Sequence, residues 1–79
     1  MSDKRLDRLK ERPRDYTWDE LIALLNGFGY KLKNASGSRR KFIDAEKRKI
    51  CLHEPHPENT LKAYVIEHVL TALEEHGKI

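Results

Sequence analysis

The six residues Gly37-Ser38-Arg39-Arg40-Lys41-Phe42 constrain the fold of this chain more than any other stretch. A Gly-Ser turn leads into three consecutive cations, and an aromatic residue follows them. Side chains alternate between the two faces of a β-strand, so Phe42 and Arg40 share one face while Arg39 and Lys41 share the other. If Phe42 points into the core, Arg39 and Lys41 must project on the free side. The stretch therefore predicts a positively charged strand that one aromatic side chain anchors.

This predicted strand lies in a basic middle third of the chain. The 79 residues carry a formal net charge of +3, but residues 30–53 hold eight basic side chains against two acidic ones. The segment before them is balanced in charge, and the segment after them is acidic. A basic block of this kind suggests a polyanion as the partner. The alternative is a solvated, lysine-rich sheet edge that prevents aggregation.

Length and composition narrow the class of protein further. A chain of 79 residues makes one small domain. The single cysteine, Cys51, excludes an internal disulfide framework and fits a reducing compartment. The charged start of the chain and the lack of a long apolar run predict a cytoplasmic protein with no membrane contact. No Gly-rich phosphate loop, paired-carboxylate site or Ser/His/Asp pattern is visible, so no cofactor is expected.

Three helices are predicted. Thr17-Trp18-Asp19-Glu20 reads as a capping box, and a wide apolar face follows it up to Phe28. A second long helix runs from Leu61, with apolar residues at spacings of three and four, and Gly77 ends it. Residues 4–12 predict a short amphipathic helix whose thin apolar stripe is expected to dock weakly or fray.

Three strands are predicted between the two long helices, over residues 30–34, 38–43 and 48–52. Their short links predict an antiparallel meander. The outward positions of these strands are Lys31, Lys33, Arg39, Lys41, Lys49 and finally His53. The inward face must take both long helices, because nothing else is available to cover them. The predicted fold is α+β: α-β-β-β-α, with a three-stranded antiparallel sheet, both main helices on one face, and a short N-terminal helix.

The order and spacing of these segments resemble the HicA toxin family, small toxins of bacterial toxin–antitoxin pairs with a double-stranded-RNA-binding-like fold. The matching segments are Trp18-Asp19-Glu20-Leu21, Gly-Phe-Gly-Tyr at 27–30, Gly37-Ser38 through Phe42, Leu52-His53-Glu54-Pro55-His56-Pro57, and Leu61-Lys62-Ala63-Tyr64. The resemblance covers roughly residues 16–75. The chain is accordingly divided into an N-terminal extension, residues 1–15, and a HicA-like domain, residues 16–79.

The resemblance implies an endoribonuclease that cleaves messenger RNA and a HicB antitoxin as its protein partner. The family's usual catalytic histidine stands just after the Gly-Ser pair, where this chain has Arg39 and Arg40. An arginine, with a pKa above about 12, cannot act as a general base, but it can bind phosphate or stabilise charge on it. The predicted phosphate-binding residues are Lys31, Lys33, Arg39, Arg40, Lys41 and Lys49.

His53 is the candidate to replace the family's catalytic histidine, because it should emerge on the basic face beside Arg39 and Lys41. The alternative is that His53 and His56 cap loop backbone groups or face solvent. Cys51, His53 and His56 have a spacing that invites a zinc site, but no second ligand pair is present, so no metal is predicted.

Three aromatic or imidazole side chains outside this set are expected to be structural. Trp18 is predicted to anchor the leading segment to the first long helix, with base stacking as the minor alternative. Tyr64 is expected in the core rather than on an RNA backbone, and His68 at the border of the apolar face. Two functions rival the toxin hypothesis: a non-catalytic RNA-binding module, and a protein-interaction domain whose basic face meets an acidic partner.

Overall fold

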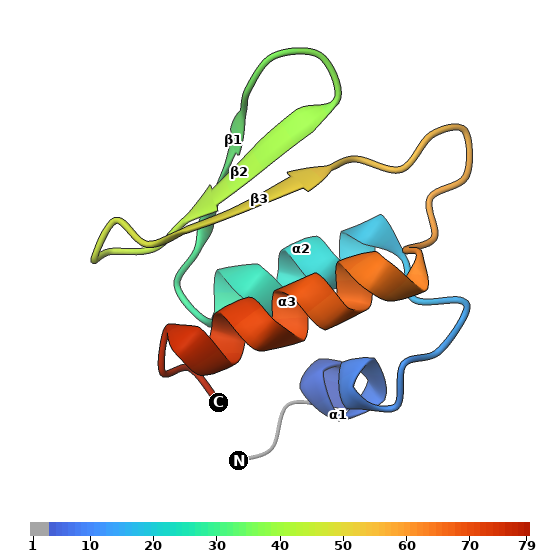
Figure 1. The fold of residues 1–79 in the computed structure, drawn as a ribbon, viewed down its shortest axis with the longest axis horizontal. Helices are drawn as coiled ribbons and strands as arrows, with labels where there is room; N and C mark the ends of the chain where they lie inside the picture. Colours follow the sequence, from blue (N-terminus) through green and yellow to red (C-terminus); the bar gives the residue numbers. More distant parts are fainter. Residues whose placement is uncertain (1–3) are drawn as a thin grey trace.

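A computed structural model of the chain describes residues 4–79, and it is an α+β fold (Figure 1). The elements in order are α1 (Lys4–Lys10), α2 (Trp18–Gly27), β1 (Lys31–Asn34), β2 (Arg39–Ile43), β3 (Lys49–His53) and α3 (Ala63–Glu75). The strands form an antiparallel sheet in the order β1-β2-β3. Helices α2 and α3 lie against one face of this sheet, and α1 lies beyond them (Figure 1). The predicted fold class is confirmed.

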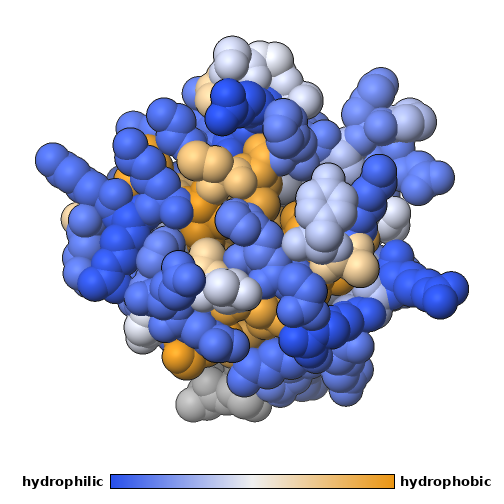
Figure 2. Space-filling view, viewed as in Figure 1, coloured by the Kyte–Doolittle hydropathy of each residue, from blue (hydrophilic) through white to orange (hydrophobic). Residues whose placement is uncertain are grey.

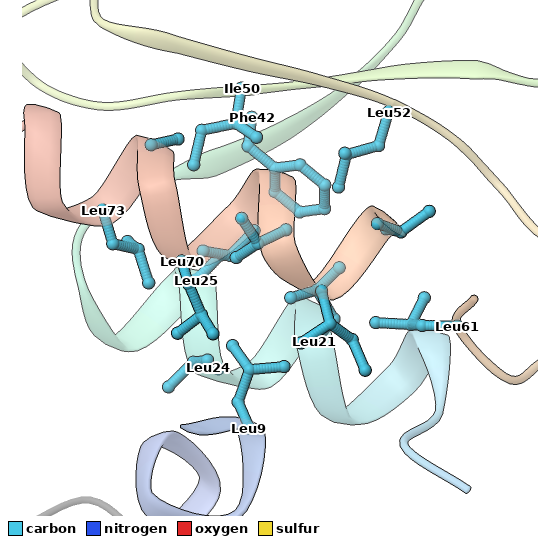
Figure 3. Close-up of a cluster of buried hydrophobic side chains, with 14 of the residues drawn as sticks. Leu9, Leu21, Leu24, Leu25, Phe42, Ile50, Leu52, Leu61, Leu70 and Leu73 are labelled. Atoms are coloured by element: carbon cyan, nitrogen blue, oxygen red, sulfur yellow. The ribbon is translucent and has the colours of Figure 1, made fainter. Parts of the chain in front are cut away.

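The core lies between the sheet and the two long helices. Leu32, Phe42 and Ile50 stand opposite one another across the three strands, and Phe42 is fully buried. Figure 3 shows Phe42, Ile50 and Leu52 pointing from the sheet toward the leucines of the helices. The Trp18 ring meets the Phe42 ring edge to face, with centroids 5.7 Å apart. Trp18 is therefore buried and anchors α2 to β2 through Phe42, whereas the sequence had suggested the leading segment as its partner.

The start of α2 is held by the predicted capping box. The Thr17 hydroxyl accepts the Glu20 amide at 3.1 Å, and the Glu20 carboxylate accepts the Thr17 amide at 3.2 Å. The same segment is tied to the loop after β3, because the Trp18 amide donates to the Asn59 carbonyl and the Leu61 amide to the Tyr16 carbonyl. Lys62, which precedes the first turn of the helix, is extended, and α3 begins at Ala63, two residues later than predicted.

Helix α1 is attached to the core more firmly than its thin apolar stripe suggested. Leu9 is fully buried and points toward α2 (Figure 3). The Tyr16 hydroxyl donates to the Arg5 carbonyl at 3.0 Å, and the Arg12 guanidinium forms an ion pair with Glu67 of α3. The expectation that α1 docks weakly is wrong. Leu9 belongs to the same hydrophobic cluster as the core residues of the sheet. The division of the chain into two parts at residue 15 stays a prediction.

The turn between β2 and β3 is fixed by a buried carboxylate. Asp44 accepts the amides of Glu46 and Arg48 at 3.0 and 2.7 Å, and Lys78 Nζ lies 3.3 Å from its other oxygen. Burial opposes ionisation of Asp44, but the Arg48 amide, Lys78 and the Glu46 amide together outweigh it, so its pKa lies below the usual range. The carboxylate therefore joins the segment that follows α3 to the turn after β2.

Within residues 4–79, no helix combines the length and the apolar character that crossing a membrane requires.

Candidate nucleic-acid interface

The sheet face that carries no helix is basic from edge to edge. Cross-strand partners share a face, and the pairing of the strands sets three rows on it: Lys31, Ile43 and Lys49; Lys33, Lys41 and Cys51; Arg39 and His53. All of these side chains are exposed or half-buried. The outward positions predicted for these residues are confirmed. We call this surface the basic face, and its five cations are Lys31, Lys33, Arg39, Lys41 and Lys49.

The charges of the basic face have no ion-pair partner in the part of the chain that the structure describes. None of the ion pairs found among residues 4–79 includes any of the five cations. Lys33 and Lys41 stand directly opposite each other, an arrangement that destabilises a sheet by itself. A bound anion would relieve this repulsion, so the face is arranged to receive negative charge.

Arg40 stands apart from the five cations. It lies on the same side of β2 as Phe42 and is half-buried. Its Nε donates to the Glu54 carboxylate at 3.1 Å, and one terminal nitrogen donates to the carbonyls of Gly37 and Arg39, both at 2.9 Å. These bonds hold the turn that precedes β2 against the segment that follows β3. A phosphate contact by Arg40 stays a prediction.

His53 lies at the corner where β2 and β3 begin and end. It is paired directly with Arg39, and its Nδ1 is 3.4 Å from the Ser38 hydroxyl. The Glu54 amide donates to the Ser38 carbonyl at 2.8 Å, which extends the pairing past the end of the strand. Ser38, Arg39 and His53 therefore meet at one exposed corner of the basic face, as the sequence predicted for Arg39 and His53.

A groove of about 430 Å³ opens beside this corner, between the start of α3 and the loop after β3, which contains Pro55 and Pro57. Its lining includes His53, His56, Lys62 and Tyr64. The two imidazoles are thus brought to one groove, with Pro55 between them in the chain. The structure joins the groove to the basic face through His53, which belongs to both.

Tyr64 and His68 are not where they were expected. Tyr64 is 68% exposed, and His68 is exposed as well. Helix α3 buries Val65, Ile66 and Val69, and residues four apart lie on one side of a helix, so Tyr64 and His68 share a side turned away from the core. The expectation that Tyr64 is packed in the core is wrong. The sequence contained the information needed to predict this exposure, because the aliphatic residues of α3 define a face that includes neither Tyr64 nor His68.

Comparison with known proteins identifies one family. A family model described as the HicA toxin of bacterial toxin–antitoxin matches residues 18–77. The match runs from the first residue of α2 past the end of α3 and leaves α1 outside. Neither the curated proteins nor the solved structures gave a match.

Proposed function

The chain belongs to the HicA toxin family of bacterial toxin–antitoxin systems, and we propose that it is a toxin that binds RNA on the basic face and cleaves messenger RNA. A HicB-like antitoxin is its protein partner, and the cytoplasm is where it acts. The observation that carries the proposal is the single exposed surface on which five unpaired cations meet His53. Family membership supports the assignment as a toxin. The five cations of the basic face support the binding of a polyanion.

Binding rests on phosphate contacts. Lysine and arginine side chains on a flat strand face can each neutralise one phosphate of a single strand, with little dependence on base sequence. Five such contacts predict a slope of log affinity against log salt concentration of about −3.5. An oligonucleotide that lies along Lys33 and Lys41 would reach the corner formed by Arg39 and His53.

Cleavage uses the ribose 2′-hydroxyl as the nucleophile. His53 takes the proton of this hydroxyl, the 2′-oxygen bonds to phosphorus, and Arg39 stabilises the charge on the phosphoryl oxygens. His56, in the same groove as His53, gives a proton to the 5′-oxygen as its bond to phosphorus breaks. The products are a 2′,3′-cyclic phosphate and a free 5′-hydroxyl. The shared groove supports this division of roles, because the reaction needs both a base and an acid.

The test is incubation of the purified protein with a labelled single-stranded RNA. The expected products end in 2′,3′-cyclic phosphate, and His53→Ala should lose about a hundredfold or more in rate while it still binds RNA. Free imidazole added to His53→Ala should restore part of the rate, which a structural defect would not allow. A His53→Ala variant that cuts as fast as the wild type would remove His53 from the reaction.

A second candidate function is a non-catalytic RNA-binding module. The specific observation in its favour is that Arg39 and Arg40 occupy the positions where the family's usual histidine is expected. Wild-type protein that binds the RNA and never cuts it would establish this function instead. Absence of RNA binding even at low salt would favour the third hypothesis, a domain whose basic face meets an acidic protein.

A further inference from the structure

Strand β3 has a free edge. Among the strands of residues 4–79 it pairs only with β2, in a sheet of the order β1-β2-β3. The Asp44 amide donates to the Arg48 carbonyl at 3.1 Å, and the Glu54 amide donates to the Ser38 carbonyl at 2.8 Å, so these two bonds flank the strand. Hydrogen-bonded pairs alternate along an antiparallel ladder, so the residues at 48, 50, 52 and 54 bond to β2. Lys49, Cys51 and His53 therefore direct their backbone groups away from β2.

The outward backbone groups of β3 have no partner within residues 4–79. A groove of about 470 Å³ runs beside them, between Cys51, Leu52 and His53 on β3 and Tyr64, Val65 and Thr71 on α3. Figure 2, which has the viewpoint of Figure 1, shows hydrophobic residues reaching the surface between hydrophilic ones in the middle of the molecule. A row of unpaired donors and acceptors beside a groove is a template for another strand.

We propose that the free edge of β3 binds an extended segment of a partner protein as a fourth, antiparallel strand, in which acidic and uncharged apolar side chains alternate. Residues of this segment that bond to Lys49, Cys51 and His53 place their side chains on the basic face, where carboxylates meet Lys49, His53 and the neighbouring Arg39. The residues between them turn toward Tyr64, Val65 and Thr71. The groove is also lined by His68 and by Glu67, whose carboxylate is paired with Arg12, so uncharged side chains suit this side of the segment.

Charge selects this occupant over a second copy of the chain. A second copy can offer only its own edge strands, and both carry lysines on the same outer face: Lys31 and Lys33 on β1, and Lys49 on β3. Pairing would gather these lysines on one face of the joined sheet with no acidic side chain among them, which disfavours a second copy. RNA has no regular row of alternating donors and acceptors to match a strand edge, whereas a peptide backbone does. The proposal that the edge of β3 binds a peptide therefore does not depend on the proposed RNA function.

The experiment uses a synthetic peptide of about seven residues in which glutamate and valine alternate, and no RNA. Its binding to the full chain is measured by fluorescence anisotropy and by amide chemical shifts. Two further peptides carry N-methyl groups, one on every glutamate amide and the other on every valine amide. In an antiparallel strand the glutamate amides face β3, so the first modification should weaken binding about tenfold or more and the second should not. The shifts should concentrate at Lys49, Cys51 and His53.

A protein variant gives an independent readout. Residue 51 donates nothing to β2, so Cys51→Pro removes a donor only from the free edge and the sheet should keep its fold. This variant should lose the peptide, while Cys51→Ser should keep it, with circular dichroism to confirm that both are folded. Failure of the unmodified peptide to bind the wild type would overturn the proposal. Equal binding of the two methylated peptides would overturn it as well, because it would mean that the peptide meets only the charge of the basic face.

Discussion

Arg39 lies directly opposite His53 in the pairing of β2 and β3, and the pair is one of those that do not share backbone hydrogen bonds. Pairs of this kind bring their Cα atoms to about 4.5 Å and their side chains closer than the hydrogen-bonded pairs do. A guanidinium and an imidazole are thereby held within reach of one phosphate group. The pairing therefore places the residue proposed to bind the phosphate, Arg39, beside the residue proposed to act as the base, His53.

Removal of Arg39 should weaken RNA binding without changing which sequences are bound. Each phosphate contact adds about 0.7 to the salt slope for a single strand, so Arg39→Ala should reduce the slope by about that amount. Lys10→Ala removes the same charge from α1, away from the basic face, and should leave the slope as it is. Titrations of a labelled oligonucleotide at several salt concentrations measure both. An equal effect of the two substitutions would mean that only net charge matters.

Replacement of Lys41 should stabilise the fold and weaken RNA binding. Lys41 faces Lys33 across the strands, so Lys41→Gln removes a repulsion and should raise the free energy of unfolding by about 0.2–1 kcal/mol at low salt. The gain should fade in high salt, because screening already weakens the repulsion. The same variant should bind RNA less tightly. Urea denaturation at two salt concentrations is the measurement, and a loss of stability at low salt would contradict the prediction.

The stability of the fold should fall in acid partly through Asp44. Its pKa in the folded chain is lowered, since the Arg48 amide and Lys78 outweigh the opposing effect of burial. The unfolded chain therefore takes up this proton at a higher pH than the folded one. The contribution of Asp44 is fully present above its unfolded pKa, about 3.9, and is lost as the pH falls through its lower folded pKa. Glu67, whose pKa the Arg12 ion pair lowers, adds to the loss in the same window.

Asp44→Asn tests this assignment. The variant should be less stable than the wild type near neutral pH, because the ion pair with Lys78 is gone. The difference between the two proteins should begin to shrink as the pH falls below about 4, where Asp44 of the unfolded wild type takes up its proton, and the loss should be complete below the lowered pKa of the folded chain. Urea denaturation over a series of pH values measures it. A constant difference at every pH would contradict the lowered pKa of Asp44 in the folded chain.

Helix α1 should be required for stability although the family match begins after it. Leu9 is fully buried and Leu6 is half-buried on the same helix. Leu9→Ala should cost about 2–5 kcal/mol, which is a large share of the stability of a domain this small, and Leu6→Ala should cost clearly less. Thermal and urea denaturation measure both. A Leu9→Ala variant as stable as the wild type would mean that α1 is a separable extension.

The sequence by itself determined the elements and their faces. The capping box at Thr17 and Glu20, the alternation of Lys31, Leu32 and Lys33, and the position of Phe42 depend on neighbours a few residues away, so local rules were enough to predict them. The two-helix cover of the sheet followed, because the apolar faces of α2 and α3 had no other surface to meet.

Only the tertiary structure decided which residues from different elements meet. The ion pair of Arg40 with Glu54, the bond of Ser38 to His53 and the attachment of α1 through Leu9 join residues far apart in the chain. The strand register and the packing of the helices set these distances, and no local periodicity encodes them. The same holds for the free edge of β3, since its openness depends on which strand pairs beside it and on where α3 lies.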